Sequence, residues 1–129
     1  MTIPVLPTSY FSLILGCTAP NNGYYGYWTP TSGGVLEIYT LIAGVFGAPK
    51  ASTAGSITAG QTFGFKRAGR TLTLMVDNVD VLSWVDTNDT FLSGYPGFGI
   101  EDTTARGDNF TATFDDSGDM SLLSRRRRL

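Results

Sequence analysis

The chain has 129 residues, of which 42% are hydrophobic, 12% aromatic and only 16% charged, which is the composition of one folded domain and not of a disordered chain. It contains no histidine and a single cysteine, which excludes histidine-dependent catalytic triads, histidine-ligated metals, internal disulfides and cysteine-rich zinc sites. The formal net charge of −2 hides an asymmetry, because four of the nine basic residues are Arg125, Arg126, Arg127 and Arg128. The rest of the chain is acidic, and we expect no nucleic-acid binding through it.

Short apolar or alternating segments, separated by turn residues, run through the chain. Residues 1–9 hold two prolines and are expected to form an extended arm, because proline lacks a backbone donor. Strands are predicted over 10–17, 24–29, 35–43, 61–67, 71–76, 79–85, 97–102 and 108–114, with a weak one near 56–58. Asp77 and Asn78 both tolerate positive φ, which predicts a two-residue type I′ hairpin between two of these strands. No segment has a convincing helical period, so the pattern favours a sandwich or a barrel.

The order of several sequence pieces between about residues 23 and 114 is informative. Asn22-Gly23-Tyr24-Tyr25 opens a strand, residues 69–74 lead into the predicted hairpin, and residues 90–100 and 108–110 close the series. In this order they resemble the concanavalin A-like lectin, glucanase and laminin-G domains. The resemblance implies an all-β fold, an antiparallel jelly-roll β-sandwich of reduced size.

The resemblance also implies a gap, since such domains have several strands before the first of these pieces. We therefore expect a sandwich domain over 10–114, preceded by the arm at 1–9 and followed by a flexible tail at 115–129 with a basic end. Unpaired sheet edges must be covered. We expect a second copy of the chain or another subunit to cover them, which predicts a homo-oligomer or a larger assembly. The arm at 1–9 is the alternative cover.

Two groups of aromatic residues are candidate sugar-binding platforms, because aromatic rings stack on sugar faces while a few polar groups orient the hydroxyls. The first group consists of Tyr24, Tyr25, Tyr27 and Trp28, and the second has Trp84 and Tyr95 as its candidate binding residues. The alternative is a structural role in the core. In a strand, Tyr25 and Tyr27 share one face while Tyr24 and Trp28 share the other, so one of these pairs is expected to be core.

Asp86, Asn88 and Asp89 lie in one predicted turn and offer oxygen ligands of the kind that calcium prefers. The same residue types are ordinary turn formers, so the sequence leaves calcium binding and a simple turn open. The four consecutive arginines form a positive tail that suits docking on an acidic partner or an anionic surface, or that is merely solvated.

The sequence disfavours catalysis, integrin recognition and a reactive cysteine. Glycoside hydrolysis needs a pair of carboxyl groups about 5–10 Å apart, whereas Glu37 and Glu101 each stand alone in a predicted strand. We therefore expect no enzymatic activity. The tripeptide Arg106-Gly107-Asp108 has the integrin-recognition sequence and falls on a predicted loop. Its aspartate also belongs to the piece at 108–110 that carries the family resemblance, which already gives it a structural explanation. Cys17 follows an apolar run and is expected to be a buried small hydrophobe.

These observations predict a non-enzymatic virion structural or decoration subunit whose lectin-like sandwich assembles on a capsid or tail and contacts host-surface glycans. The setting follows by analogy, because sandwiches of this type decorate phage particles. The chain also opens at Met1 without the basic region of a secretion signal, and no apolar run is long enough for a membrane span. The alternative is a freestanding extracellular carbohydrate-binding lectin.

Overall fold

A computed structural model describes residues 1–5, 10–19, 21–30, 33–88, 90, 95–100, 106–108, 112–114 and 120–122. Within these residues every strand pairs antiparallel to its neighbours, and no α-helix is present. The strands are β1 (Thr2–Val5), β2 (Phe11–Ala19), β3 (Asn22–Thr29), β4 (Val35–Leu41), β5 (Ala51–Ala54), β6 (Phe63–Ala68), β7 (Thr71–Val76), β8 (Val79–Val85), β9 (Tyr95–Ile100), β10 (Arg106–Asp108), β11 (Ala112–Phe114) and β12 (Met120–Leu122). The predicted all-β class is confirmed.

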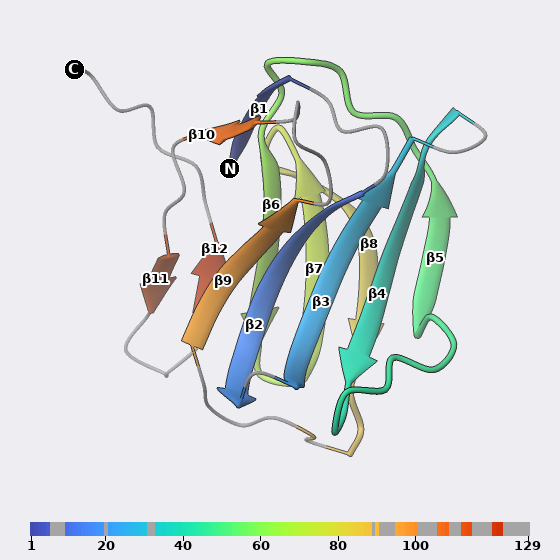
Figure 1. The fold of residues 1–129 in the computed structure, drawn as a ribbon, viewed down its shortest axis with the longest axis vertical. Coiled ribbons are helices and arrows are strands. Elements are labelled where there is room, and N and C mark those ends of the chain that lie inside the picture. Colours follow the sequence, from blue (N-terminus) through green and yellow to red (C-terminus); the bar gives the residue numbers. More distant parts are fainter. Residues whose placement is uncertain are drawn as a thin grey trace.

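The strands form two five-stranded sheets and a small ribbon. One sheet has the order β5-β4-β3-β2-β9, the other has the order β11-β12-β6-β7-β8, and β1 pairs with β10. Figure 1 shows the first sheet in front of β6, β7 and β8, with the β1–β10 ribbon across one end. The arrangement is β-sandwich-like.

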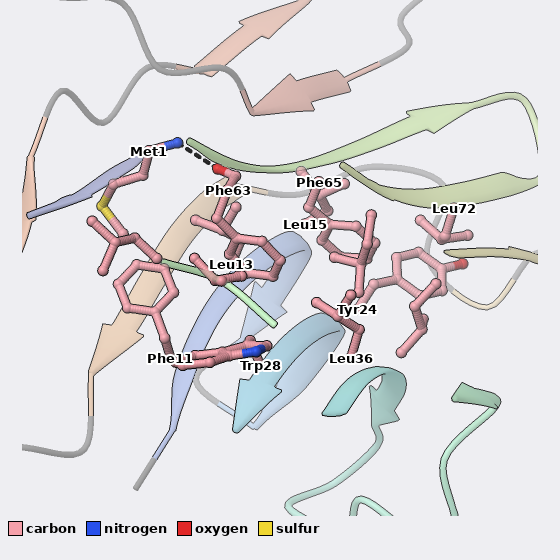
Figure 2. Close-up of a cluster of buried hydrophobic side chains, with 14 residues drawn as sticks. Met1, Phe11, Leu13, Leu15, Tyr24, Trp28, Leu36, Phe63, Phe65 and Leu72 are labelled. Carbon is pink, nitrogen blue, oxygen red and sulfur yellow. Dashed lines mark hydrogen bonds between the residues drawn. The ribbon is translucent and has the colours of Figure 1, made fainter. Parts of the chain in front are cut away.

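One hydrophobic core fills the space between the two sheets (Figure 2). Alternate residues of each strand point inward, so β2, β3 and β4 contribute from one side and β6 and β7 from the other. The fully buried large side chains are Met1, Ile3, Phe11, Leu13, Leu15, Tyr24, Leu36, Ile38, Phe63, Phe65, Leu72 and Leu74. The predicted strands at 10–17, 24–29, 35–43, 61–67, 71–76 and 79–85 all correspond to observed strands.

The predicted hairpin is confirmed. Asp77 and Asn78 have φ values of 50° and 63° and join β7 directly to β8. The Asp77 carboxylate also accepts hydrogen bonds from the backbone N–H of Thr62 and from Nε2 of Gln61, both at 2.9 Å. These bonds anchor the turn to the segment that leads into β6.

Short strands lie within both the predicted arm and the predicted tail. The arm contains β1, and Met1 and Ile3 are buried in the core because alternate residues of this strand face it. The Met1 amino group donates a hydrogen bond to the Phe63 carbonyl oxygen (Figure 2). In the predicted tail, β12 pairs with β6 and β11.

Strands from the last third of the chain extend both sheets. β9 pairs with β2 in the first sheet, and β12 pairs with β6 in the second. These pairings cover one edge of β2 and one edge of β6. The weak strand predicted near 56–58 is instead β5 at Ala51–Ala54, while Ile57 is buried beside it without joining a strand.

Candidate functional site

The outer face of the first sheet carries a cluster of aromatic rings. In β3, Tyr25 and Tyr27 point away from the core because their neighbours on the alternate positions are buried. The register places Tyr39 of β4 opposite Tyr25, and Glu37 opposite Tyr27. Residues directly opposite each other in a sheet share a face, so these four side chains emerge together.

Two further rings join the cluster from outside these strands. Tyr10, just before β2, lies 5.0 Å from Tyr27 between ring centroids, and Phe46 lies 5.1 Å from Tyr25. Phe46 reaches the sheet face because the chain after β4 turns back sharply at Ala43 and Gly44, which both have positive φ. We call Tyr10, Tyr25, Tyr27, Tyr39 and Phe46 the outer aromatic cluster.

The turn that carries Phe46 is fixed by backbone hydrogen bonds. Asn22 Oδ1 accepts a hydrogen bond from the Ala43 N–H at 2.8 Å, and the Asn21 carbonyl accepts one from the Gly44 N–H at 3.0 Å. Ile42 and Val45 also exchange backbone hydrogen bonds. The loop therefore holds Phe46 at one position over the sheet.

Most rings of the cluster meet edge to face. Tyr27 lies 5.4 Å from Tyr39 at an interplanar angle of 83°, and Phe46 lies 5.7 Å from Tyr27 at 76°. Only the stacked pair of Tyr25 and Tyr27, at 19°, departs from this arrangement among these contacts. Edge-to-face pairs contribute about 0.5–1.5 kcal/mol each beyond their buried area, so the cluster supports itself without a ligand.

A hollow of about 370 Å³ opens in this face, lined by Tyr10, Tyr27, Thr29, Glu37, Tyr39, Phe46 and Gly47. Inside it, the Tyr39 hydroxyl donates a hydrogen bond to Glu37 Oε2 at 3.0 Å. Burial raises the pKa of Tyr39, and the hydrogen bond and charge of Glu37 raise it further. Tyr39 therefore stays protonated, and the hollow combines apolar rings with a carboxylate and hydroxyl groups.

The structure divides the first predicted aromatic group between two faces. Tyr25 and Tyr27 belong to the outer cluster, whereas Tyr24 and Trp28 are buried in the core (Figure 2). Each buried ring has a partner for its polar atom: the Tyr24 hydroxyl donates to Asp86 Oδ2 at 2.6 Å, and Trp28 Nε1 donates to the Gly55 carbonyl at 3.1 Å. These two residues are structural.

The second predicted aromatic group is not brought together. Trp84, on β8, is half-buried and packs edge-on against Tyr24, with the centroids 6.4 Å apart. Tyr95 begins β9 in the other sheet and is 78% exposed. A shared platform formed by these two rings is not seen.

The Asp86 carboxylate accepts hydrogen bonds from its own turn and from Tyr24. Its Oδ1 accepts a hydrogen bond from the Asn88 N–H at 3.0 Å, and its Oδ2 accepts from the Thr90 N–H at 3.0 Å as well as from Tyr24. Burial raises the pKa of Asp86, but these hydrogen bonds outweigh burial and leave the pKa below its ordinary value. The arrangement is that of a turn former. Asp89 lies outside the described residues.

No group of three His, Cys, Asp or Glu side chains that could hold a metal occurs in the described part of the chain. Nor does that part contain a helix long and apolar enough to cross a membrane.

The remaining candidates fall elsewhere. Arg125, Arg126, Arg127, Arg128 and Glu101 lie outside the described residues, so the docking role of the arginine tail stays a prediction. The tripeptide at 106–108 is strand β10, paired with β1, and not the loop that was predicted. Cys17 is half-buried and not fully buried, and it lies opposite Tyr95.

Sequence reasoning missed four binding residues of the site, namely Tyr10, Glu37, Tyr39 and Phe46. A signal for Tyr39 was present, because Glu37 and Tyr39 share one face of an alternating strand. Pairing that strand with its predecessor would have placed both beside Tyr25 and Tyr27. Phe46 sits in a loop without periodicity, so its position depends on the turn geometry.

The chain matches no protein-family model, and neither the curated proteins nor the solved structures contain a match to it. The hollow on the outer face must therefore be interpreted from its own geometry.

Proposed function

We propose that this chain is a non-enzymatic carbohydrate-binding subunit that holds a glycan in the hollow on the outer face of the first sheet. The proposal rests on one observation: aromatic rings and the hydrogen-bonded pair of Glu37 and Tyr39 line the same open hollow. Sugar rings present apolar C–H faces that pack on aromatic rings and hydroxyls that bond to polar groups, and a site of this composition meets both needs. We further propose that the fold belongs to the concanavalin-like jelly-roll class, and two five-stranded antiparallel sheets around one core support this.

The size and support of the hollow fit this role. Its volume of about 370 Å³ falls in the range of about 300–1,000 Å³ that is usual for small-molecule sites. Tyr27, Glu37 and Tyr39 lie on central strands of the sheet, whose backbone is held by hydrogen bonds on both sides. A rigid platform loses little entropy on binding.

The composition of the hollow favours binding over catalysis. Glycoside hydrolysis uses two carboxyl groups about 5–10 Å apart, one on each side of the scissile bond. Of the described residues that line the hollow, Glu37 is the one that carries a carboxyl group, and it is hydrogen-bonded to Tyr39. We therefore propose a binding protein.

A glycan array followed by calorimetry on the best ligand tests the proposal. Tyr27→Ala and Phe46→Ala remove rings that line the hollow, and each is expected to weaken binding about tenfold, the equivalent of about 1.4 kcal/mol. Tyr95→Ala is the matched control, because this tyrosine is exposed and does not line the hollow. Binding that survives both substitutions in cooperatively melting variants, or no binding to any glycan, would refute the proposal.

A second candidate function is assembly, as a virion structural or decoration subunit on a capsid or tail. The observation that favours it is an exposed apolar edge strand. Among the described strands, β8 is the last one of the second sheet. Three of its valines are exposed, Val79 at 62%, Val81 at 38% and Val85 at 51%. An apolar edge strand is a template for pairing with another chain, so we propose that β8 meets a second copy, while the glycan hollow faces the host.

Light scattering of the purified chain tests this assembly. A discrete oligomer is expected, and Val81→Lys should shift it toward the monomer because a charge on an edge strand opposes pairing. Ile42→Lys places the same charge at another exposed apolar residue, in the loop after β4, and should leave the oligomer intact. A monomer at every concentration would argue against self-assembly through β8.

A further inference from the structure

Glu37 is a half-buried carboxylate without a cationic partner among the described side chains. The ion pair found in that part of the chain is Lys66–Asp80, which joins two strands of the other sheet. Glu37 instead lines the hollow and accepts a hydrogen bond from the Tyr39 hydroxyl through Oε2. One neutral donor satisfies part of a carboxylate's capacity to accept hydrogen bonds. The remaining capacity and the negative charge face the hollow.

The surrounding aromatic rings also favour a positively charged ligand. Tyr27, Tyr39 and Phe46 stand at 75–83° to one another, with centroids 5.4–5.8 Å apart. The face of an aromatic ring is electronegative and attracts a cation within about 6 Å of its centroid. A cation in the hollow would therefore be attracted by the Glu37 carboxylate and by each ring face that it overlies, whereas the carboxylate would repel an anion.

We propose that the ligand of the hollow is an amino sugar whose protonated amino group pairs with Glu37 while its ring packs on the aromatic cluster. This inference rests on the proposed function and names its ligand class. The acidic balance of the chain before its arginine tail adds attraction at longer range. A neutral sugar offers Glu37 only uncharged hydroxyl donors, whereas a protonated amine forms a charge-assisted hydrogen bond, which is stronger.

Calorimetry with two oligosaccharides of equal length tests the proposal. Glucosamine tetramer and its fully N-acetylated counterpart differ in charge but share the same sugar backbone. At about pH 6, where carboxylates are ionised and the amine is protonated, the charged tetramer should bind at least about tenfold more tightly, since a hydrogen bond to a charged group contributes enough for that factor. Added salt should reduce the preference.

Two variants isolate Glu37. Glu37→Gln keeps the size of the side chain and an oxygen that accepts from Tyr39, so it should abolish the preference while the protein still melts cooperatively. Asp80→Asn makes the same change in net charge on the other sheet and should leave the preference unchanged. If both variants lower it equally, the effect is one of general charge and the assignment to Glu37 is refuted.

The outcomes separate this inference from the proposed function. If both tetramers bind equally well, the chain binds glycans but the amino-sugar assignment is wrong. If no saccharide binds, both proposals fall. Tetramethylammonium, a cation without a sugar ring, serves as a further probe. If it binds while neither tetramer does, the hollow is a cation site and the amino-sugar assignment is overturned.

Discussion

Gly26 of β3 packs directly against the opposite sheet, and a single methyl group there tests the packing. The residue lies between Tyr25 and Tyr27 and faces inward. A Cβ atom added at Gly26 would lie 2.4 Å from Cδ2 of Leu74 and 3.2 Å from the Phe65 ring. Both neighbours are fully buried on the opposite sheet. Carbon atoms in contact prefer about 3.5–4.0 Å, so Leu74 or the strand must move by about 1 Å.

The expected effect of Gly26→Ala follows from two opposing terms. Overpacking of a well-packed core costs about 1–3 kcal/mol. Replacing a glycine inside a strand returns about 0.5–1 kcal/mol of backbone entropy. The central values of these ranges leave a net loss of about 1.2 kcal/mol in the free energy of unfolding, measured by urea denaturation. That loss corresponds to a fall in Tm of about 3–6 °C for a domain of this size.

A matched control and a compensating substitution make the prediction specific. Gly97→Ala lies in the same sheet, but its Cβ would meet Ile14 at an ordinary 3.7 Å, so its free energy of unfolding should not fall. Leu74→Val removes the atom that the new methyl strikes. The double variant of Gly26→Ala with Leu74→Val should therefore lose about 1 kcal/mol less free energy of unfolding than the two single variants lose in sum. Equal stability of the two alanine variants, or strict additivity, would refute the argument.

Four more local predictions follow from the same structure. Tyr24→Phe should lower the free energy of unfolding by about 1.5–3 kcal/mol, because it removes a hydrogen bond to a charged, buried carboxylate; a smaller loss in urea denaturation would contradict this. The depressed pKa of Asp86 means that its contribution is present above the ordinary aspartate pKa and is lost as pH falls through the folded value, so Asp86→Asn should flatten the acid limb of a pH–stability curve. With a free amino group at Met1, burial lowers the pKa of that amine from 8.0 to about 5. The unfolded chain then binds the proton first as pH falls, so the free energy of unfolding should decline from pH 8 to pH 5, and a flat curve would refute it. Asp80→Asn should cost less than about 1 kcal/mol because its ion pair with Lys66 is exposed, and a larger loss would show a structural role.

The glycan and assembly proposals place different demands on the two sheets. The outer aromatic cluster lies on β3 and β4 with the loop that follows, whereas the exposed valines lie on β8 of the other sheet. The two surfaces can therefore be altered independently. A variant that loses the oligomer but keeps glycan affinity, and one with the opposite behaviour, would show that the functions are separate.

The local pattern of the sequence determined the class of the fold and several of its details. Alternation in residues 24–29 separated Tyr25 and Tyr27 from Tyr24 and Trp28, because successive side chains of a strand point to opposite faces. The Asp77–Asn78 turn was predictable because the residue types that accept positive φ are few. These properties depend on residues within a few positions of one another, and a single sequence therefore contains them.

Tertiary structure decided which face became the core and which rings formed a site. Tyr24 and Trp28 turned inward because the opposite sheet covers that face of β3. Tyr10, Tyr39 and Phe46 joined Tyr27 through strand register and a loop turn. Likewise, the burial of Met1 and the pairing of β12 with β6 join residues far apart in the chain. Such contacts form only when the whole core assembles, because their stabilisation depends on burial that no short segment can achieve.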